Sequence, residues 1–133
     1  MTPGFAVDWI ELEPGRPHPI LDLTVTAQPA RHTPETNPTS LRVEIGGKIV
    51  AYTGDTEWTD GVAAVARGAD LFIAECYYYA KPIKWHLNYP AIAAHRGELE
   101  ARRVILTHMS REMLEHADEV PEECASDGLV VTL

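Results

Sequence analysis

Long apolar runs, cysteine motifs and a leader segment are all missing from this sequence. No apolar run approaches the roughly 18 residues that a membrane-spanning helix needs. No charged, then apolar, then small-residue segment opens the chain, so nothing indicates secretion. The two cysteines, Cys76 and Cys124, have no metal-binding or redox spacing. We therefore expect a cytoplasmic protein with free thiols and no membrane partner.

Basic residues are also scarce. The 133 residues include 11 Lys and Arg against 20 Asp and Glu, which gives a formal net charge of −9. Binding to nucleic acid through a general electrostatic field needs clustered Lys and Arg, so the composition disfavours a nucleic-acid partner. Bound cations could still bring a phosphodiester to the chain, and this route stays open.

The sequence does contain the pattern of one globular domain. With 45% hydrophobic and 23% charged residues, the composition is ordinary for a folded chain of 133 residues. Alternating apolar and polar residues predict strands in the first part, with a loop over 29–38 and a hairpin turn at Gly46-Gly47. The predicted strands are Phe5–Glu13, Leu21–Ala27, Leu41–Ile45 and Lys48–Thr53.

Helices and strands alternate after this hairpin. Leu71–Cys76 and Val104–Thr107 are apolar runs typical of strands that are buried on both faces. Helices are predicted from Thr59 to Gly68, over Tyr89–Leu99 and over Glu112–Ala117, and a last strand over Leu129–Leu133. Such alternation indicates helices that cover a sheet, so the fold class is α/β (α+β).

Three polar residues occur where a packed core would not select them. Asp55 follows the strand-like run that ends in Gly54, His108 follows another apolar run, and His32 lies in the loop after the second strand. Carboxylates are hard oxygen ligands, and imidazole is a common ligand of zinc and iron. Each residue also has a structural alternative: Asp55 as a turn or helix cap, His108 as a hydrogen-bonded group at a helix start, and His32 as a solvated loop residue.

Taken together, these motifs resemble a known family. The ordered set is Tyr52-Thr53-Gly54-Asp55-Thr56, then Ala69-Asp70-Leu71-Phe72-Ile73-Ala74-Glu75, then His86, then Leu106-Thr107-His108-Met109-Ser110. It resembles the second half of the metallo-β-lactamase fold, closest in style to the ribonuclease Z-like branch. The likeness runs from about Phe5 to Leu133, so it implies an αββα sandwich of which residues 1–133 are the C-terminal half.

The resemblance also implies roles for single residues. His32, Asp55 and His108 would be metal ligands, with Asp55 bridging two ions and therefore taking part in catalysis. His86 would be a second catalytic residue that assists the leaving group. Glu75 would orient His86 or a ligand, although an ion pair with a nearby arginine is an equal alternative. The implied cofactor is zinc, two ions in the complete fold, with iron or manganese as alternatives.

The principal signature of the family, His-x-His-x-Asp-His, is absent from the chain. We expect it in an N-terminal half that lies upstream, which predicts either that missing half or self-association as the partner. The resemblance implies hydrolysis of a phosphodiester, ester or thioester by a metal-activated water. The alternatives are a non-catalytic remnant or interaction subunit with the same fold, and an unrelated small α/β binding domain.

Several other residues are interpreted as surface or packing residues. They are His18, His95 and His116, together with Trp85 and Tyr77-Tyr78-Tyr79, for which walls of a substrate pocket are the alternative.

Overall fold

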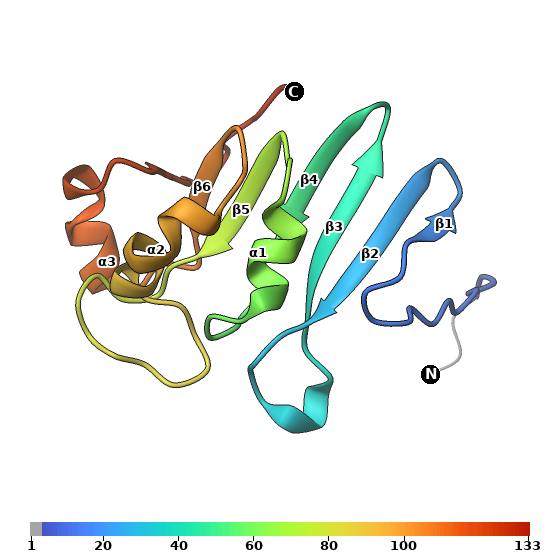
Figure 1. Ribbon diagram of the computed structural model, residues 1–133, viewed down its shortest axis with the longest axis horizontal. Helices are drawn as coiled ribbons and strands as arrows, with labels where there is room; N and C mark the ends of the chain where they lie inside the picture. The colour runs from blue at the N-terminus through green and yellow to red at the C-terminus, as the bar shows by residue number, and fades with distance from the viewer. Residues whose placement is uncertain (1–3) are drawn as a thin grey trace.

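A computed structural model describes residues 4–133 as one seven-stranded sheet with helices on one face (Figure 1). The strands follow each other across the sheet in the order in which they occur in the chain. They are β1 (His18–Ile20), β2 (Leu23–Pro29), β3 (Thr39–Ile45), β4 (Lys48–Tyr52), β5 (Leu71–Glu75), β6 (Val104–Thr107) and β7 (Glu123–Cys124). The mixed α/β fold class predicted from the sequence is confirmed.

The first four strands form an antiparallel meander. The hairpin between β3 and β4 turns at Gly46 and Gly47, whose φ angles are 56° and 75°. A two-residue turn in which both φ angles are positive matches the twist of the paired strands, and glycine adopts these angles without a steric penalty. The predicted hairpin is therefore confirmed, with its turn at the two glycines.

From β4 onward neighbouring strands are parallel, and helices connect them. The helices are α1 (Asp60–Ala66), α2 (Tyr89–His95) and α3 (Arg111–Glu115), with short 3-10 helices η1 (Pro34–Thr36), η2 (Arg96–Glu98) and η3 (Ala117–Glu119). Thr59 is the N-cap of α1 as predicted, but its hydroxyl makes no capping bond. No helix among residues 4–133 is both long and apolar enough to cross a membrane.

The core lies between the sheet and these helices. Ala51, Phe72 and Leu106 point to the same face of β4, β5 and β6, and all three are buried. They pack with buried residues that the helices contribute, namely Val62, Val65, Ile92 and Met113. This packing fixes the ends of β4, β5 and β6 relative to one another.

The opposite face of the sheet is apolar and carries none of the three α-helices. Two rows cross it in register. One row runs Val25, Val43, Val50 and Leu71, and the other runs Ala27, Leu41, Tyr52, Ile73 and Ile105. Some members of these rows are buried, but Tyr52 is 39% exposed. This surface, the open sheet face, has the composition of a core layer.

The predictions for both ends of the chain were wrong. Residues 5–13 pair with no strand, and Phe5 and Trp9 are 73% and 92% exposed. A segment with alternating residues forms a strand only where the edge of a sheet is free to pair with it. The edge beside β2 is occupied by β1, a strand that was not predicted. Leu129–Leu133 likewise forms no strand, because β7 takes the edge beside β6. The predicted helix over Tyr89–Leu99 ends at His95 and continues as η2.

Candidate metal centre

Three neighbouring strands deliver polar groups to one edge of the sheet. Because β4, β5 and β6 are parallel, their carboxyl ends meet at the same edge, where α/β proteins place ligand sites. Asp55 follows β4 after a turn at Gly54, which has a φ of +61°. A Cβ at Gly54 would lie 3.1 Å from the carbonyl oxygen of Thr39, so this turn requires glycine. Glu75 ends β5, and His108 directly follows β6.

His32 reaches the same place from the loop after β2. The backbone N–H of Arg31 donates to Oγ1 of Thr56 at 2.9 Å, and the N–H of Glu57 donates to the carbonyl of Arg31 at 2.9 Å. These two bonds fasten the His32 loop to the Asp55 loop. The Nδ1 atom of His32 lies 3.1 Å from the hydroxyl of Thr33, which leaves Nε2 free for another contact.

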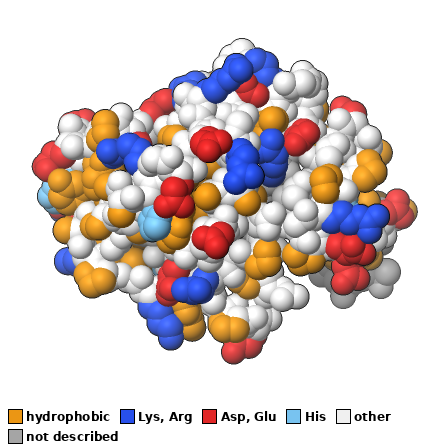
Figure 2. Space-filling view, in the orientation of Figure 1, with side chains coloured by type: hydrophobic (Ala, Val, Ile, Leu, Met, Phe, Trp, Pro, Cys, Tyr) orange, Lys and Arg blue, Asp and Glu red, His pale blue; other side chains and the backbone are white. Residues whose placement is uncertain are grey.

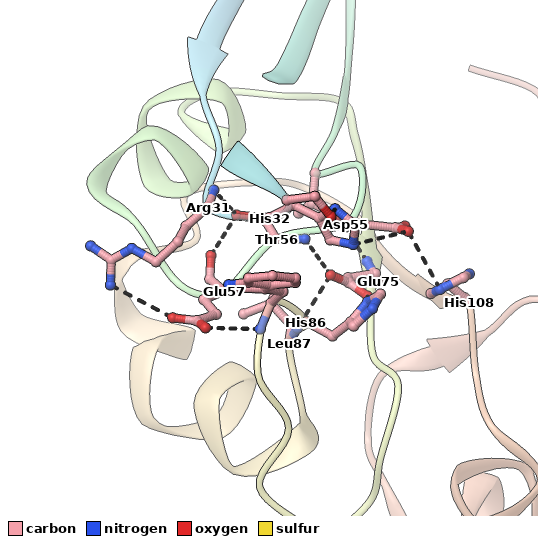
Figure 3. A network of polar contacts seen from close by, with 12 residues as sticks. Arg31, His32, Asp55, Thr56, Glu57, Glu75, His86, Leu87 and His108 are labelled. Atoms are coloured by element: carbon pink, nitrogen blue, oxygen red, sulfur yellow. Dashed lines mark hydrogen bonds and ion pairs between the residues drawn. The ribbon is translucent and has the colours of Figure 1, made fainter. Parts of the chain in front are cut away.

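The structure brings together the three predicted ligands, as Figure 3 shows. Oδ2 of Asp55 lies 3.9 Å from Nε2 of His32 and 3.7 Å from Nε2 of His108 (Figure 3). His108 has a φ of +53°, an unusual angle for a residue other than glycine. The N-caps of α1 and α3 are Thr59 and Ser110, so neither Asp55 nor His108 occupies the N-cap position of a helix.

Glu75 is fully buried, and its partner is His86 rather than an arginine. Oε2 of Glu75 lies 2.8 Å from Nδ1 of His86, and Oε1 accepts the backbone N–H groups of Thr56 and of Leu87. Burial raises the pKa of Glu75 to about 8, and the two backbone donors oppose that rise. One proton between Oε2 and Nδ1 satisfies both atoms and leaves Nε2 of His86 free.

Four side chains could hold a metal ion. Asp55, Glu75, His86 and His108 each offer a ligand atom, and these atoms all lie within 4.8 Å of one another. Imidazole nitrogens and carboxylate oxygens are ligands of zinc and iron. Two ligand atoms that bind one zinc ion at about 2.0–2.1 Å lie about 3.3 Å apart at a tetrahedral angle. The predicted ligand His32 is not one of these four, but Oδ2 of Asp55 lies 3.9 Å from His32 and 3.7 Å from His108. Both separations need only a small closure to reach the tetrahedral value, so the residues fit a metal ion.

Aromatic rings surround this group of residues. The rings of His86 and His108 are stacked with centroids 5.4 Å apart, and that of His32 meets His86 edge to face at 5.1 Å. Tyr77 lies against both His86 and His108, at 5.1 and 5.5 Å. Trp85 lies 6.0 Å from His32. Tyr77 and Trp85 were interpreted from the sequence as packing residues. In the structure, both rings pack against histidines of the candidate centre.

The remaining histidines lie elsewhere. His95 stacks on Trp58 with centroids 3.9 Å apart, and His116 stacks on Tyr79 at 4.2 Å. His18 accepts the backbone N–H of Glu13 at 2.8 Å.

Sequence reasoning missed Glu57. Its carboxylate accepts the backbone N–H of Trp85 at 2.8 Å and lies 3.7 Å from the guanidinium of Arg31. Glu57 thereby links the His32 loop to the segment that carries His86 (Figure 3). A glutamate two residues after Asp55 has no pattern of its own, so only the folded chain reveals this role.

Two curated proteins resemble the chain over part of its length. The probable metallo-hydrolase YhfI of Bacillus subtilis (strain 168) is 30% identical over 73 residues, which is 53% of this chain and 30% of that protein. The uncharacterized protein ML1173 of Mycobacterium leprae (strain TN) is 28% identical over 105 residues, which is 76% of this chain and 35% of that protein. The chain thus spans about a third of the length of these relatives.

Solved structures share its fold. The crystal structure of the metallo-β-lactamase fold protein YhfI from Bacillus subtilis superposes with a TM-score of 0.70 at 25% identity, over 87% of this chain and 51% of that one. Zinc-bound PqqB from Methylobacterium extorquens gives a TM-score of 0.68 at 18% identity, over 92% and 55%. The short form of human tRNase Z gives 0.64 at 20% identity, over 86% and 45%. The last two likenesses concern the fold alone.

A sequence profile agrees with these likenesses. The profile described as "Beta-lactamase superfamily domain" matches residues 2–109, which is most of the chain and includes every residue of the candidate centre. The chain therefore belongs to the β-lactamase superfamily and has the metallo-β-lactamase fold.

Proposed function

We propose that the chain is the C-terminal half of a metal-dependent hydrolase that cleaves a phosphodiester, ester or thioester. The observation that supports this most strongly is the convergence of Asp55, Glu75, His86 and His108 at the carboxyl ends of three parallel strands. Glu75 is buried at the base of this group, Asp55 and His86 are partly buried, and His108 is exposed, so the four ligand atoms are arranged at a surface that an ion can reach. A metal site uses such a set.

The proposed ligands are His32, Asp55 and His108, and the proposed metal is zinc, with iron or manganese as alternatives. Both imidazoles face Oδ2 of Asp55, and a carboxylate has a second oxygen, so Asp55 would be able to contribute to more than one ion. A bound ion would lower the pKa of a coordinated water toward about 7 and polarise the scissile group. The contact of His32 with Thr33 orients its ring so that Nε2 is presented to Asp55.

His86 is the proposed proton donor to the leaving group. Its Nδ1 atom is fixed against Glu75, so the free Nε2 is the atom that can hold a proton for the substrate. Leu87, the next residue, donates its backbone N–H to the same carboxylate at 3.2 Å, which fixes the main chain beside the ring. Glu75 acts through His86, by fixing the direction of that ring through its Nδ1 atom.

The proposed enzyme needs more than this chain supplies. The chain spans about half of the YhfI structure, and its open sheet face has the composition of a core layer. We infer that an upstream half bearing His-x-His-x-Asp-His covers that face and completes two metal sites, with pairing of two copies as the alternative. If neither occurs, a non-catalytic interaction subunit is the function that the same face favours.

We also propose a cytoplasmic location. Cys76 and Cys124 are both free, and reduced thiols persist in the reducing cytosol. Cys76 directly follows β5 and Cys124 ends β7, and these two strands flank β6. About 9–10 Å therefore separates the two backbones, beyond the roughly 7 Å at which a disulfide closes.

Metal content and hydrolysis test the proposal together. The chain is purified alone and after mixing with an upstream half taken from a family member, and zinc, iron and manganese are measured in each sample. Hydrolysis of a phosphodiester, an ester and a thioester is then followed with and without a chelator. We expect chelator-sensitive hydrolysis in the completed sample only. Absence of metal and of turnover in both samples would contradict the proposed enzyme and favour the interaction subunit.

A further inference from the structure

The segment that joins β5 to His86 differs in composition from the rest of the chain. Residues 77–86 contain Tyr77, Tyr78, Tyr79 and Trp85, together with Lys81 and Lys84, and no acidic residue. The chain as a whole has a net charge of −9, so this segment is a local exception of opposite sign. It lies beside the candidate metal centre, because Tyr77 and Trp85 contact the histidines there.

One lysine reaches the centre through Trp85. Nζ of Lys84 lies over the ring of Trp85, 4.4 Å from its centroid. The same ring lies 6.0 Å from that of His32, whose Nε2 is 3.9 Å from Asp55. A cation therefore rests on an aromatic wall of the centre, at a distance that favours attraction between the charge and the ring face.

The second lysine reaches the centre by a parallel route. Nζ of Lys81 lies 5.4 Å from the centroid of Tyr78. Tyr78 meets Tyr77 edge to face at 4.8 Å, and Tyr77 packs against His86 and His108. Each lysine therefore contacts an aromatic side chain, Trp85 or Tyr78. Trp85 packs against His32 directly, and Tyr78 packs against Tyr77, which contacts His86 and His108.

Neither lysine has a carboxylate partner within residues 4–133. Both are exposed, whereas Arg31, Arg42 and Arg103 each form an ion pair with a glutamate. Acidic and basic side chains are interspersed over the face shown in Figure 2, so no broad patch of one sign covers it. Within the segment, Lys81 and Lys84 are therefore the cations that remain available to an anion.

The segment is held in place at several points. The backbone N–H of Tyr77 donates to Leu87 and that of Tyr89 donates to Tyr78, both at 2.8 Å. The amide of Asn88 donates to the carbonyl of Lys81 at 3.0 Å. Trp85 has a φ of +70°, a costly angle for a bulky residue, and its N–H is fixed by Glu57. These bonds fix the segment, and with it Tyr77 and Trp85, beside the candidate centre.

We propose that Lys81, Lys84, Tyr77, Tyr78 and Trp85, the lysine–aromatic rim, recognise an organic phosphate ester that carries a planar aromatic group. The lysines bind the phosphate oxygens as point charges, and the aromatic walls pack against the ring of the substrate. The rim thereby selects among the phosphodiester, ester and thioester substrates left open above. The role of the rim in turnover rests on the proposed hydrolase, but its binding of the anion does not.

Binding is measured on the full chain with a chelator present, by nuclear magnetic resonance titration of backbone and indole N–H signals. The probes are phenyl phosphate, inorganic phosphate and phenol. We expect phenyl phosphate to bind more tightly than either probe that lacks the ring or the charge, and to shift the indole signal of Trp85. Lys84→Met should weaken phenyl phosphate about two- to five-fold, the effect of losing one exposed cation contact. Lys48→Met is the matched control.

Lys48 is also exposed and forms no ion pair with the residues that the structure describes, but it lies at the far end of β4 from Asp55. Affinities that Lys84→Met and Lys48→Met leave equally unchanged would overturn the proposal, as would phenol binding as tightly as phenyl phosphate. Turnover is measured separately on the completed, metal-loaded protein. Rim-dependent binding without hydrolysis of any substrate would refute the hydrolase and leave recognition standing. Hydrolysis of a neutral ester without rim-dependent binding would support the hydrolase and refute the recognition of a phosphate ester by the rim.

Discussion

Glu75 and His86 form a closed pair in which one carboxylate fixes both a ring and the main chain beside it. One oxygen of Glu75 lies 2.8 Å from Nδ1 of His86, and the other accepts the backbone N–H of Leu87 at 3.2 Å. The carboxylate is fully buried and also accepts the N–H of Thr56 from the Asp55 loop. The pair therefore couples the orientation of a proposed catalytic group to the folding of two loops.

Loss of this carboxylate should destabilise the fold. Glu75→Ala leaves the Thr56, Leu87 and His86 groups without their acceptor, and each buried unpaired group costs about 1–3 kcal/mol. We therefore expect the free energy of unfolding in urea to fall by at least about 3 kcal/mol. Glu35→Ala, at an exposed glutamate, should change it by less than about 0.5 kcal/mol. Equal stability of the two variants would show that the carboxylate is dispensable.

Removal of the proposed ligands should abolish both metal binding and hydrolysis in the completed enzyme. Asp55→Ala removes the group that lies between His32 and His108, and His108→Ala removes one of its two imidazole neighbours. His95→Ala should have no such effect, because His95 stacks on Trp58 away from the centre. Metal content and rate are measured on the same preparations. Normal turnover in the His108 variant would exclude the proposed ligand set.

His86→Ala should keep the metal and slow the reaction. Assistance by a positioned acid is typically worth about 10²–10⁴-fold in rate, so a loss of that size is expected at unchanged metal content. The four-residue cluster also offers His86 as a ligand. Loss of metal in this variant would assign His86 to the metal, and an unchanged rate would make it structural.

The open sheet face should govern association. Tyr52 lies in the middle of this face and is 39% exposed, so Tyr52→Lys adds a charge there with little cost to the helix-side core. We expect the isolated wild-type chain to self-associate in size-exclusion chromatography with light scattering, and the variant to shift toward the monomer. Leu21→Lys, at a position 98% exposed in the turn between β1 and β2, is the control and should leave association unchanged. A monomeric wild-type chain would refute this use of the face.

The two thiols should differ in reactivity. Burial raises the pKa of Cys76 to about 12, so this thiol stays protonated and inaccessible at pH 8. Cys124 is only partly buried, although burial raises its pKa as well. We expect a thiol reagent to label one cysteine per native chain and two after denaturation. Because the folded pKa of Cys76 lies above the unfolded value near 9, the stability that its thiol contributes should decline as pH rises from about 9 toward 12. Labelling of both thiols in the native protein would contradict this order.

Much of the centre could be predicted because its residues follow strong local patterns. An apolar run that ends in one ionisable residue marks Asp55 and His108, and the register of parallel strands brings such ends together. Glu57 and Trp85 could not be predicted in their roles, since the bond between them joins segments 28 residues apart. The strand predicted over Phe5–Glu13 failed for a related reason, because pairing depends on which edge another segment already occupies.

The order of the strands across the sheet has a consequence for the way the chain acquires its structure. Each ladder joins a strand to the one that precedes it in the sequence, from β1 to β7. Every strand can therefore add to a finished edge as it leaves the ribosome, without waiting for a distant partner, and loop closure stays inexpensive in entropy. His108 directly follows β6, so its place beside Asp55 depends on the pairing of β6 with β5.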